Sequence, residues 1–217
     1  MSKKSRDQGG LVTIFSPPYF GGREIGQTFS SGSAEIPGRV VETSLYAITD
    51  DFSKQYLLMR FKVTSVTDGS AETMFYGHEY GREYLRSLVR RGSTRVDGVF
   101  RVTTKDGYGL RVTATAFTVG RTRSVKKRAI RKIMTDVVQR AAARLTLDQL
   151  AQELVLGKTA SEIYNEARKI ALIRHVGSTK SKVISLPEES REQASPAEET
   201  NEAPPGEGQK KGQKPRR

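Results

Sequence analysis

The side chains of this sequence with the clearest potential for chemistry are cations, and they are densest between Gly120 and Arg144. This stretch carries nine lysines and arginines against one acid, Asp136. Its apolar residues recur at the spacing of a single helical face, so most of the cations should point away from the protein body. A solvated surface is one interpretation, and neutralisation of a polyanion is the other. The expected polyanion contacts are Arg121, Arg123, Lys126, Lys127, Arg128, Arg131 and Lys132.

A second group of arginines recurs every four residues, at Arg82, Arg86 and Arg90. Because residues four apart share one face of a helix, these three side chains should lie together. Arginine is well suited to bidentate contacts with phosphate. Glu79 and Glu83 are close enough in sequence to pair with some of them. Phosphate binding and local ion pairing therefore both remain open.

A third group lies in the segment 101–111, where Asp106-Gly107 predicts a tight turn between two strands. Lys105, beside that turn, is a candidate for contact with a polyanion. Tyr108 could stack on an unpaired nucleobase, as aromatic side chains do in many RNA-binding proteins. It could equally cover the hairpin, and the sequence does not choose between these two roles.

The residues that an enzyme would need are largely missing. Cysteine is absent, which excludes thiolate nucleophiles and cysteine-based metal sites. The two histidines, His78 and His175, are too few for a zinc site, and a histidine among aromatic residues, as His78 is, is typically packed and hydrogen-bonded. The glycine-rich segments lack the spacing of a nucleotide-binding loop. We expect no catalytic residue, metal or cofactor, while carboxylates that only folding brings together stay open.

The composition indicates a polyanionic partner. The formal net charge is +13 and the sequence pI is about 10.0, which favours RNA, DNA or an anionic membrane surface. No run approaches the roughly 18 apolar residues of a membrane span, and the N-terminus lacks the apolar stretch of a secretion signal. We therefore expect a soluble, intracellular protein with no membrane partner and no small-molecule substrate.

Residues 11–119 alternate with a period of two and are rich in Val, Thr, Phe and Tyr, which predicts β-strands. The pairs Asp68-Gly69 and Asp106-Gly107 lie between such runs and predict two tight hairpin turns. The segment 15–26 is interpreted as an irregular lead-in, with close approach of its glycine-rich backbone to RNA as the alternative. The expected strands span residues 11–15, 38–48, 56–66, 71–76, 94–104 and 108–119.

A period of 3.6 residues predicts helices in two parts of the chain. The first interrupts the strands and should cap one side of the sheet, and the others follow Gly120. Capping-box spacing and a terminal glycine mark the ends of the later helices. The expected helices span 80–91, 124–145, a segment opened by Thr146 with Gln149 and closed by Gly157, and a segment opened by Thr159 with Glu162.

These elements predict an α+β fold, with a mostly antiparallel, β-barrel-like body, one inserted helix, a C-terminal helical section and disordered termini. A short β return is expected at 172–176 and 182–186. The acidic-then-basic tail is either a solubilising extension or a basic tip that threads along RNA. The chain is expected to consist of a flexible basic N-terminus (1–10), a single domain (11–186) and a disordered charged tail (187–217). The domain is expected to comprise the β body (11–119), a helical section (120–171) and the β return (172–186).

Several segments, in the same order along the chain, resemble a known family. The most specific is Thr103–Tyr108, followed by Leu110-Arg111 and Ala116–Thr118. Further matching segments are Gly38–Leu45, Arg60–Val63, Phe75–His78 and Ile130–Met134. Together they are similar to the archaeal and eukaryotic small-subunit ribosomal protein S-three-Ae family, over about residues 23–186.

The resemblance implies a structural constituent of the small ribosomal subunit in the cytoplasm, bound to rRNA on the platform near the rRNA 3′ end and the mRNA exit. Neighbouring small-subunit ribosomal proteins would be partners, with mRNA near the exit as a further candidate. By motif match it adds Arg111 to the expected rRNA contacts. The Lys-rich N-terminal extension of eukaryotic members has no counterpart here, which suggests an archaeal source. The alternative function is a free nucleic-acid-binding translation or chromatin factor.

Overall fold

The computed structural model describes residues 10–30, 36–67 and 69–187. The predicted flexible N-terminus and charged tail, apart from Gly10 and Pro187, lie outside these ranges. The strands are β1 (Gly10–Phe15), β2 (Glu24–Ser30), β3 (Val40–Ser44), β4 (Leu57–Thr67), β5 (Ser70–Tyr80), β6 (Arg95–Thr103), β7 (Gly109–Thr118) and β8 (Ile173–Ser185). The helices are α1 (Leu45–Thr49), α2 (Arg82–Leu88), α3 (Ser124–Arg144), α4 (Leu147–Leu156) and α5 (Lys158–Ala167), with 3-10 turns at Pro18–Phe20 and Phe52–Lys54.

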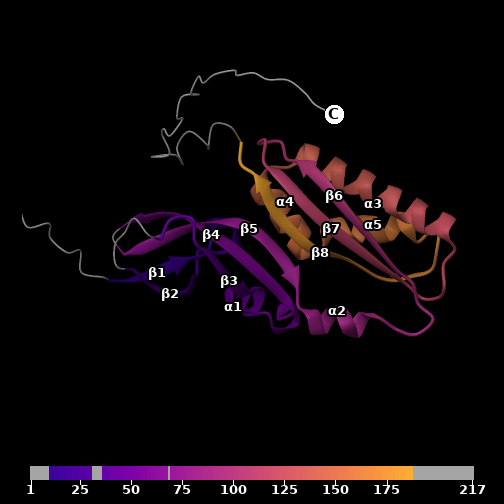
Figure 1. The fold of residues 1–217 in the computed structure, drawn as a ribbon, viewed down its shortest axis with the longest axis horizontal. Helices are drawn as coiled ribbons and strands as arrows, with labels where there is room; N and C mark the ends of the chain where they lie inside the picture. Colours follow the sequence, from indigo (N-terminus) through magenta and orange to yellow (C-terminus); the bar gives the residue numbers. More distant parts are fainter. Residues whose placement is uncertain (1–9, 31–35, 68, 188–217) are drawn as a thin grey trace, which may run out of the picture. The chain divides into compact units, whose positions relative to one another are not determined.

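The eight strands form one open sheet in which β5 joins two halves (Figure 1). One edge of β5 pairs with β4 along its whole length, and β3 pairs with β4 beyond it. The other edge pairs first with β1, in parallel, and then with β8, antiparallel, and β7 and β6 follow. The prediction of an α+β fold with a mostly antiparallel sheet is confirmed. The barrel-like closure is wrong, because β2, β3 and β6 each pair on one side only among the described strands.

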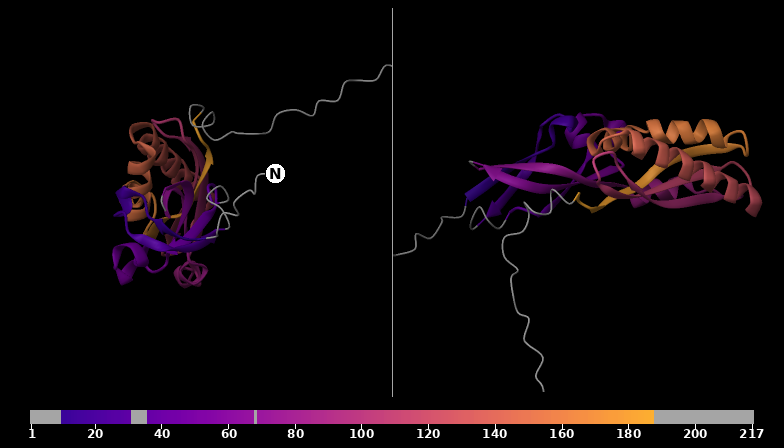
Figure 2. Two further views of the ribbon diagram at one scale, coloured as in Figure 1. Left: turned by 90° about the vertical axis from the view of Figure 1, so that its left-hand side faces the viewer. Right: turned by 90° about the horizontal axis from the view of Figure 1, so that it is seen from above.

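Helices α3, α4 and α5 gather beside the half of the sheet that holds β6, β7 and β8 (Figures 1 and 2). α3 buries Ile130, Met134 and Val137 completely, so its predicted apolar face is confirmed. Burial of each such side chain contributes about 1.5–3 kcal/mol, which is what holds a cation-rich helix on the sheet. No helix in the described ranges is both long enough and apolar enough to cross a membrane.

Local signals correctly placed the helix that follows α3 and both hairpins. The capping box of Thr146 and Gln149 opens α4, and Gly157 closes it in the left-handed conformation. Gly107, with φ of 79°, completes the turn between β6 and β7, where its N–H donates to the Thr104 carbonyl at 3.0 Å. Gly69 has a positive φ of 80° between β4 and β5. Both predicted antiparallel hairpins are therefore confirmed.

The predicted strand 38–48 is wrong in its second half, because residues 45–49 form α1. The Ser44 hydroxyl accepts a hydrogen bond from the Ala47 N–H and so caps the helix. Leu45 and Ile48, three residues apart, are then buried on one side. An N-cap and a pair of apolar residues at helical spacing outweighed the β-like composition.

Other boundaries also differ from the predictions. Residues 24–26, expected in an irregular lead-in, belong to β2 and pair with β1. The inserted helix is shorter than predicted, because Tyr80 ends β5 and Val89 is extended. The two-part β return is a single strand, β8, whose partners change from β7 alone to β7 and β5 together.

The predicted cap of the third helix is also wrong. Gly157 serves as the N-cap of α5, and Thr159 makes no capping hydrogen bond. The Thr159 side chain is buried instead, and its hydroxyl has no partner among the described residues.

Candidate nucleic-acid interface

The N-terminal half of α3 presents cations to solvent. Arg128 and Lys132 lie one helical turn apart and are exposed, while Ile130 and Met134 are buried on the opposite side. Among the described residues, no carboxylate lies within ion-pair distance of Arg128 or Lys132. Arg131 is exposed too, but its Nε donates to the Asp97 carbonyl of β6 at 2.9 Å, so it ties α3 to the edge of the sheet.

The C-terminal half of the same helix has a different electrostatic character. Arg140 forms an ion pair of 2.7 Å with Glu166 of α5, and Arg144 approaches Glu153 of α4 at 3.8 Å. The hydrogen bond and charge of Glu166 raise the pKa of Arg140. Acids from the neighbouring helices thus balance one end of α3 and leave the other end positive.

Tertiary contacts bring a second group of cations to the positive end of α3. The Thr94 N–H donates to the Thr118 hydroxyl at 3.1 Å, and the Thr122 N–H donates to the Thr94 hydroxyl at 3.0 Å. These bonds join the loop 89–94 to the loop 119–123. Arg90 and Arg91 therefore lie on the loop beside the one that carries Arg121 and Arg123. We call these two loops and residues 124–132 the basic end.

The start of α3 is itself unusual in charge. The first turn carries no acid, and Arg123 occupies the N-cap position without making a capping bond. Because a helix N-terminus bears partial positive charge, Lys126 and Lys127 nearby add repulsion that a bound anion would relieve. A hollow of about 530 Å³ opens here, and it is lined by Arg121, Arg123 and Lys126 together with the apolar side chains of Val119, Ala171 and Leu172. The start of α3 is therefore a region of uncompensated positive charge among the described residues.

The remaining predicted contact residues do not join the basic end. Arg82 and Arg86 are exposed on α2, and Arg86 pairs with Glu83 at 3.6 Å. Arg90, by contrast, lies beyond the end of α2 on the loop 89–94 of the basic end, so the prediction that all three arginines share one helical face is wrong.

The residues of the β6–β7 hairpin lie elsewhere again. Lys105 is at the far end of α3, where its N–H donates to the Leu145 carbonyl, and 21 helical residues correspond to about 30 Å. Tyr108 is half-buried and packs against the main core, which favours its structural role. Arg111 is exposed on β7.

The structure places His78 in a packing role. His78 is 1% exposed. Its Nε2 lies 2.8 Å from the Ser178 carbonyl, and its Nδ1 lies 2.7 Å from the Ser181 hydroxyl. Burial lowers the pKa of His78 to about 4, so the ring is neutral near pH 7. The prediction of a packed, hydrogen-bonded His78 is confirmed.

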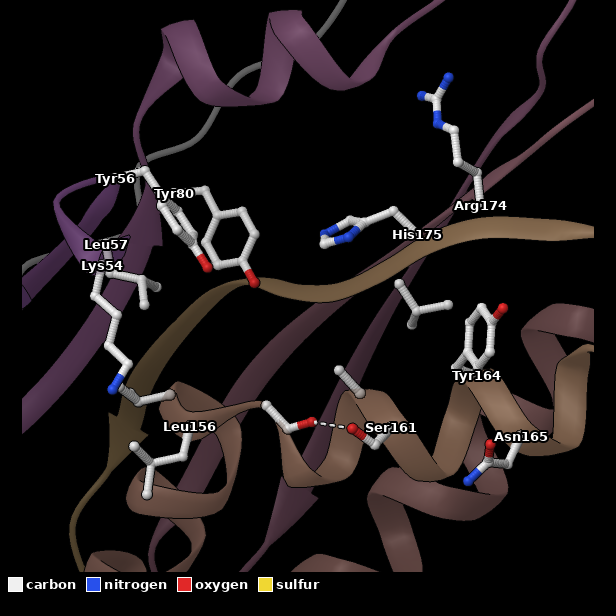
Figure 3. Close-up of a pocket in the computed structure, with 14 residues that line it drawn as sticks. Lys54, Tyr56, Leu57, Tyr80, Leu156, Ser161, Tyr164, Asn165, Arg174 and His175 are labelled. Atoms are coloured by element: carbon white, nitrogen blue, oxygen red, sulfur yellow. Dashed lines mark hydrogen bonds between the residues drawn. The ribbon is translucent and has the colours of Figure 1, made fainter. Parts of the chain in front are cut away.

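A second hollow, of about 400 Å³, lies among Tyr56, Tyr80, Tyr164 and His175 (Figure 3). Burial raises the pKa of Tyr56 to about 12 and lowers that of His175, to which Arg174 also contributes. Both pKa shifts favour the neutral forms of Tyr56 and His175. In the part of the chain that the structure describes, no group of three or more His, Asp or Glu residues could hold a metal ion.

The described residues thus form a packed α+β domain with one cation-rich end and no catalytic constellation, and comparison with known proteins identifies its family. Residues 10–187 match the model of the Ribosomal S3Ae family. The chain belongs to this family and is accordingly a structural ribosomal protein rather than an enzyme.

Three relatives illustrate the similarity, and each is called small ribosomal subunit protein eS1. The protein from Staphylothermus marinus is 44% identical over 174 residues, which cover 80% of this chain and 82% of the relative. The protein from Archaeoglobus fulgidus is 43% identical over 188 residues, with 86% and 89% covered. The protein from Saccharolobus islandicus is 42% identical over 176 residues, with 81% and 85% covered. All three sources are archaea, in agreement with the expected origin.

Proposed function

We propose that this chain is a structural constituent of the small ribosomal subunit and that it binds rRNA through the basic end. Residues 11–186 would form the single rRNA-binding domain. The observation that carries the proposal is the contrast within α3. Arg140 and Arg144 are paired with acids, while Arg128 and Lys132 are exposed and have no carboxylate partner among the described residues.

The physical basis is counterion release. A phosphate that contacts a protein cation frees a condensed counterion, so affinity falls steeply as salt rises. The cations of the basic end come from two loops and one helix, which lets a single RNA segment meet several of them at once. Arg128 and Lys132 are spaced by about 6 Å along the helix axis and can contact different phosphates.

The family supports a more specific location. We place the protein in the cytoplasmic ribosome, on the platform of the small subunit, near the rRNA 3′ end and the mRNA exit. Neighbouring ribosomal proteins, and mRNA near the exit, would be further partners. Val119, Val125 and Leu172 are 52%, 75% and 66% exposed at or beside the basic end. Such apolar surface suits contact with a neighbouring protein.

The test compares two double variants that remove equal charge from α3. Arg128→Gln with Lys132→Gln should leave the fold intact, weaken binding to small-subunit rRNA, and lower the slope of log affinity against log salt by roughly 1.5–2. The control, Arg140→Gln with Arg144→Gln, should bind rRNA nearly as the wild type does. Each variant is also expressed in cells, and the small subunits are then isolated, washed at increasing salt and sedimented. The first variant should dissociate from the small subunits at a lower salt concentration than the control variant.

Two results would contradict the proposal. If both double variants lost rRNA affinity equally, net charge rather than the basic end would be responsible. If the wild-type protein sedimented apart from small subunits even at low salt, a free nucleic-acid-binding factor would be the better interpretation.

A further inference from the structure

A second set of cations lies on the sheet, in three neighbouring strands. The register places Arg101 of β6 opposite Arg111 of β7, and Arg111 opposite Lys182 of β8. Directly opposite residues in antiparallel strands point to the same face. The three side chains therefore form one cross-strand row, which we call the cation row.

The cation row points away from the helices. Its strand neighbours Val102, Val112 and Val183 are buried in the main core. Because successive residues of a strand alternate between faces, the cations must project from the other face. All three are exposed. The row and the outer side of α3 thus lie on opposite sides of the two-layer domain.

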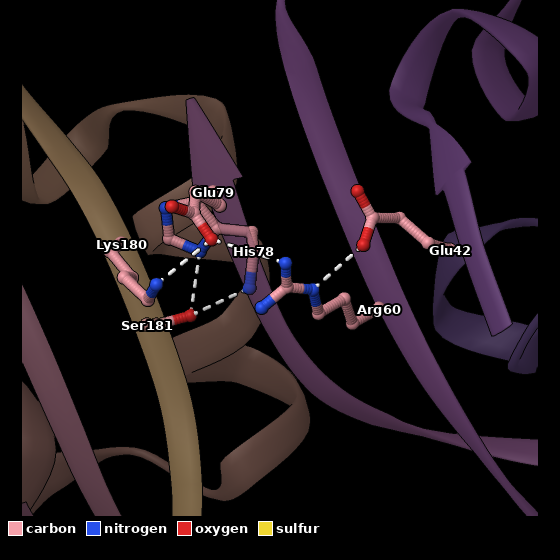
Figure 4. Close-up of polar contacts among 6 residues, drawn as sticks. All are labelled: Glu42, Arg60, His78, Glu79, Lys180 and Ser181. Carbon is pink, nitrogen blue, oxygen red and sulfur yellow. Dashed lines mark hydrogen bonds and ion pairs between the residues drawn. The ribbon is translucent and has the colours of Figure 1, made fainter. Parts of the chain in front are cut away.

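Neighbouring cations on the sheet are neutralised, as Figure 4 shows. Lys180 pairs with Glu79 at 2.9 Å. Arg60 pairs with Glu79 at 3.2 Å and with Glu42 at 2.9 Å. This chain of pairs alternates in sign across β8, β5, β4 and β3.

The cation row has no such partners. Within the described ranges, no carboxylate lies at ion-pair distance from Arg101, Arg111 or Lys182. The Lys182 ammonium lies 5.5 Å from the centre of the Tyr76 ring, a contact that leaves its charge in place. Among the residues that the structure describes, three positive charges therefore stand side by side without a compensating carboxylate.

This arrangement works against the stability of the isolated protein. Like charges directly opposite in a sheet repel, since their Cβ atoms are about 4.5–5.5 Å apart. A row across three strands spans roughly 10 Å, and a ligand that relieves all three charges must be negative over at least that length. A phosphodiester backbone has this property, and the planar guanidinium groups of Arg101 and Arg111 match phosphate oxygens in bidentate geometry.

We propose that the cation row binds the backbone of an RNA segment, so that the domain holds two RNA segments on opposite faces. This inference rests on the proposed function only in taking RNA as the class of partner, and it concerns a different surface of the protein. An acidic polypeptide is the competing occupant, because its carboxylates would also relieve the repulsion within the row.

A bridging assay with the full chain tests the proposal. One single-stranded RNA is fixed to beads, limiting protein is added, and a second, fluorescent RNA is offered. The wild-type protein should retain the fluorescent strand. Arg111→Gln with Lys182→Gln should still bind the fixed RNA but retain roughly tenfold less of the second strand, with an unchanged or higher Tm. Arg140→Gln with Arg144→Gln is the charge-matched control and should bridge normally, and the two termini are the same in all proteins.

Each other outcome is decisive. Equal bridging by the row variant and the control would overturn the proposal. A wild-type protein that fails to bridge RNA, but binds a fluorescent polyglutamate peptide through the row, would assign the row to an acidic polypeptide and also overturn it. If Arg128→Gln with Lys132→Gln binds the fixed RNA normally while the row variant does not, the cation row is an RNA site and the basic end is not, which overturns both the proposed function of the basic end and the claim that the domain holds two RNA segments.

Discussion

The buried histidine at the junction of β5 and β8 should make the stability of this protein depend on pH. The Ser178 carbonyl can only accept a hydrogen bond, so Nε2 of His78 must carry the proton. The Ser181 hydroxyl accepts from the His78 backbone N–H and donates to Nδ1. Protonation would place a second N–H against that hydroxyl and a charge in a site that water does not reach. The folded state therefore holds His78 neutral.

The sign and size of the effect follow from linkage. Burial lowers the pKa of His78 from 6.5 to about 4 in the folded protein. Between these pH values the unfolded chain binds a proton that the folded chain does not, so the free energy of unfolding falls as pH falls. The difference corresponds to about 3 kcal/mol, fully lost once pH passes below the folded-state pKa.

Urea unfolding followed by circular dichroism, from neutral pH to about pH 4, measures this loss. His78→Gln is the matched variant, because its amide can still donate to Ser178 while it does not titrate. It should start less stable, since the Ser181 hydroxyl loses its acceptor, and then lose less stability on acidification. Carboxylates and His175 titrate in both proteins, so the difference between the two curves isolates His78. If the free energy of unfolding fell equally with pH in the wild-type protein and in His78→Gln, the reasoning would be refuted.

Two further predictions concern buried groups. Thr159→Val removes a buried hydroxyl without a described partner, so the free energy of unfolding measured in urea should be unchanged or higher by up to about 1–2 kcal/mol. A lower free energy of unfolding would mean that this hydroxyl has a hydrogen-bond partner in the folded protein. Gly77→Ala should lower the free energy of unfolding by about 1–3 kcal/mol, because a Cβ on Gly77 would overlap the Ser181 carbonyl where β5 meets β8. Gly26→Ala is the control, because a Cβ at that position meets open space. Equal stability of the two variants would contradict the described pairing of β5 with β8.

Local interactions made part of this protein predictable from its sequence. The apolar face of α3, the capping box at Thr146 and the positive-φ glycine at Gly107 all depend on residues within about four positions of one another. The cations were visible for the same reason, since composition and helical spacing require no knowledge of the fold. The family resemblance came from short segments of this kind and is confirmed.

Only the tertiary structure decided which cations are available. Arg140 and Arg128 look alike in sequence, yet Glu166 on another helix neutralises the first and no described acid reaches the second. The cation row depends on strand register, which pairs Arg111 with Lys182 across a long separation in sequence. The open sheet arises in the same way, because β8 pairs with β5 as well as with β7. Charge compensation and strand pairing are contacts between distant residues, and a single sequence does not specify them locally.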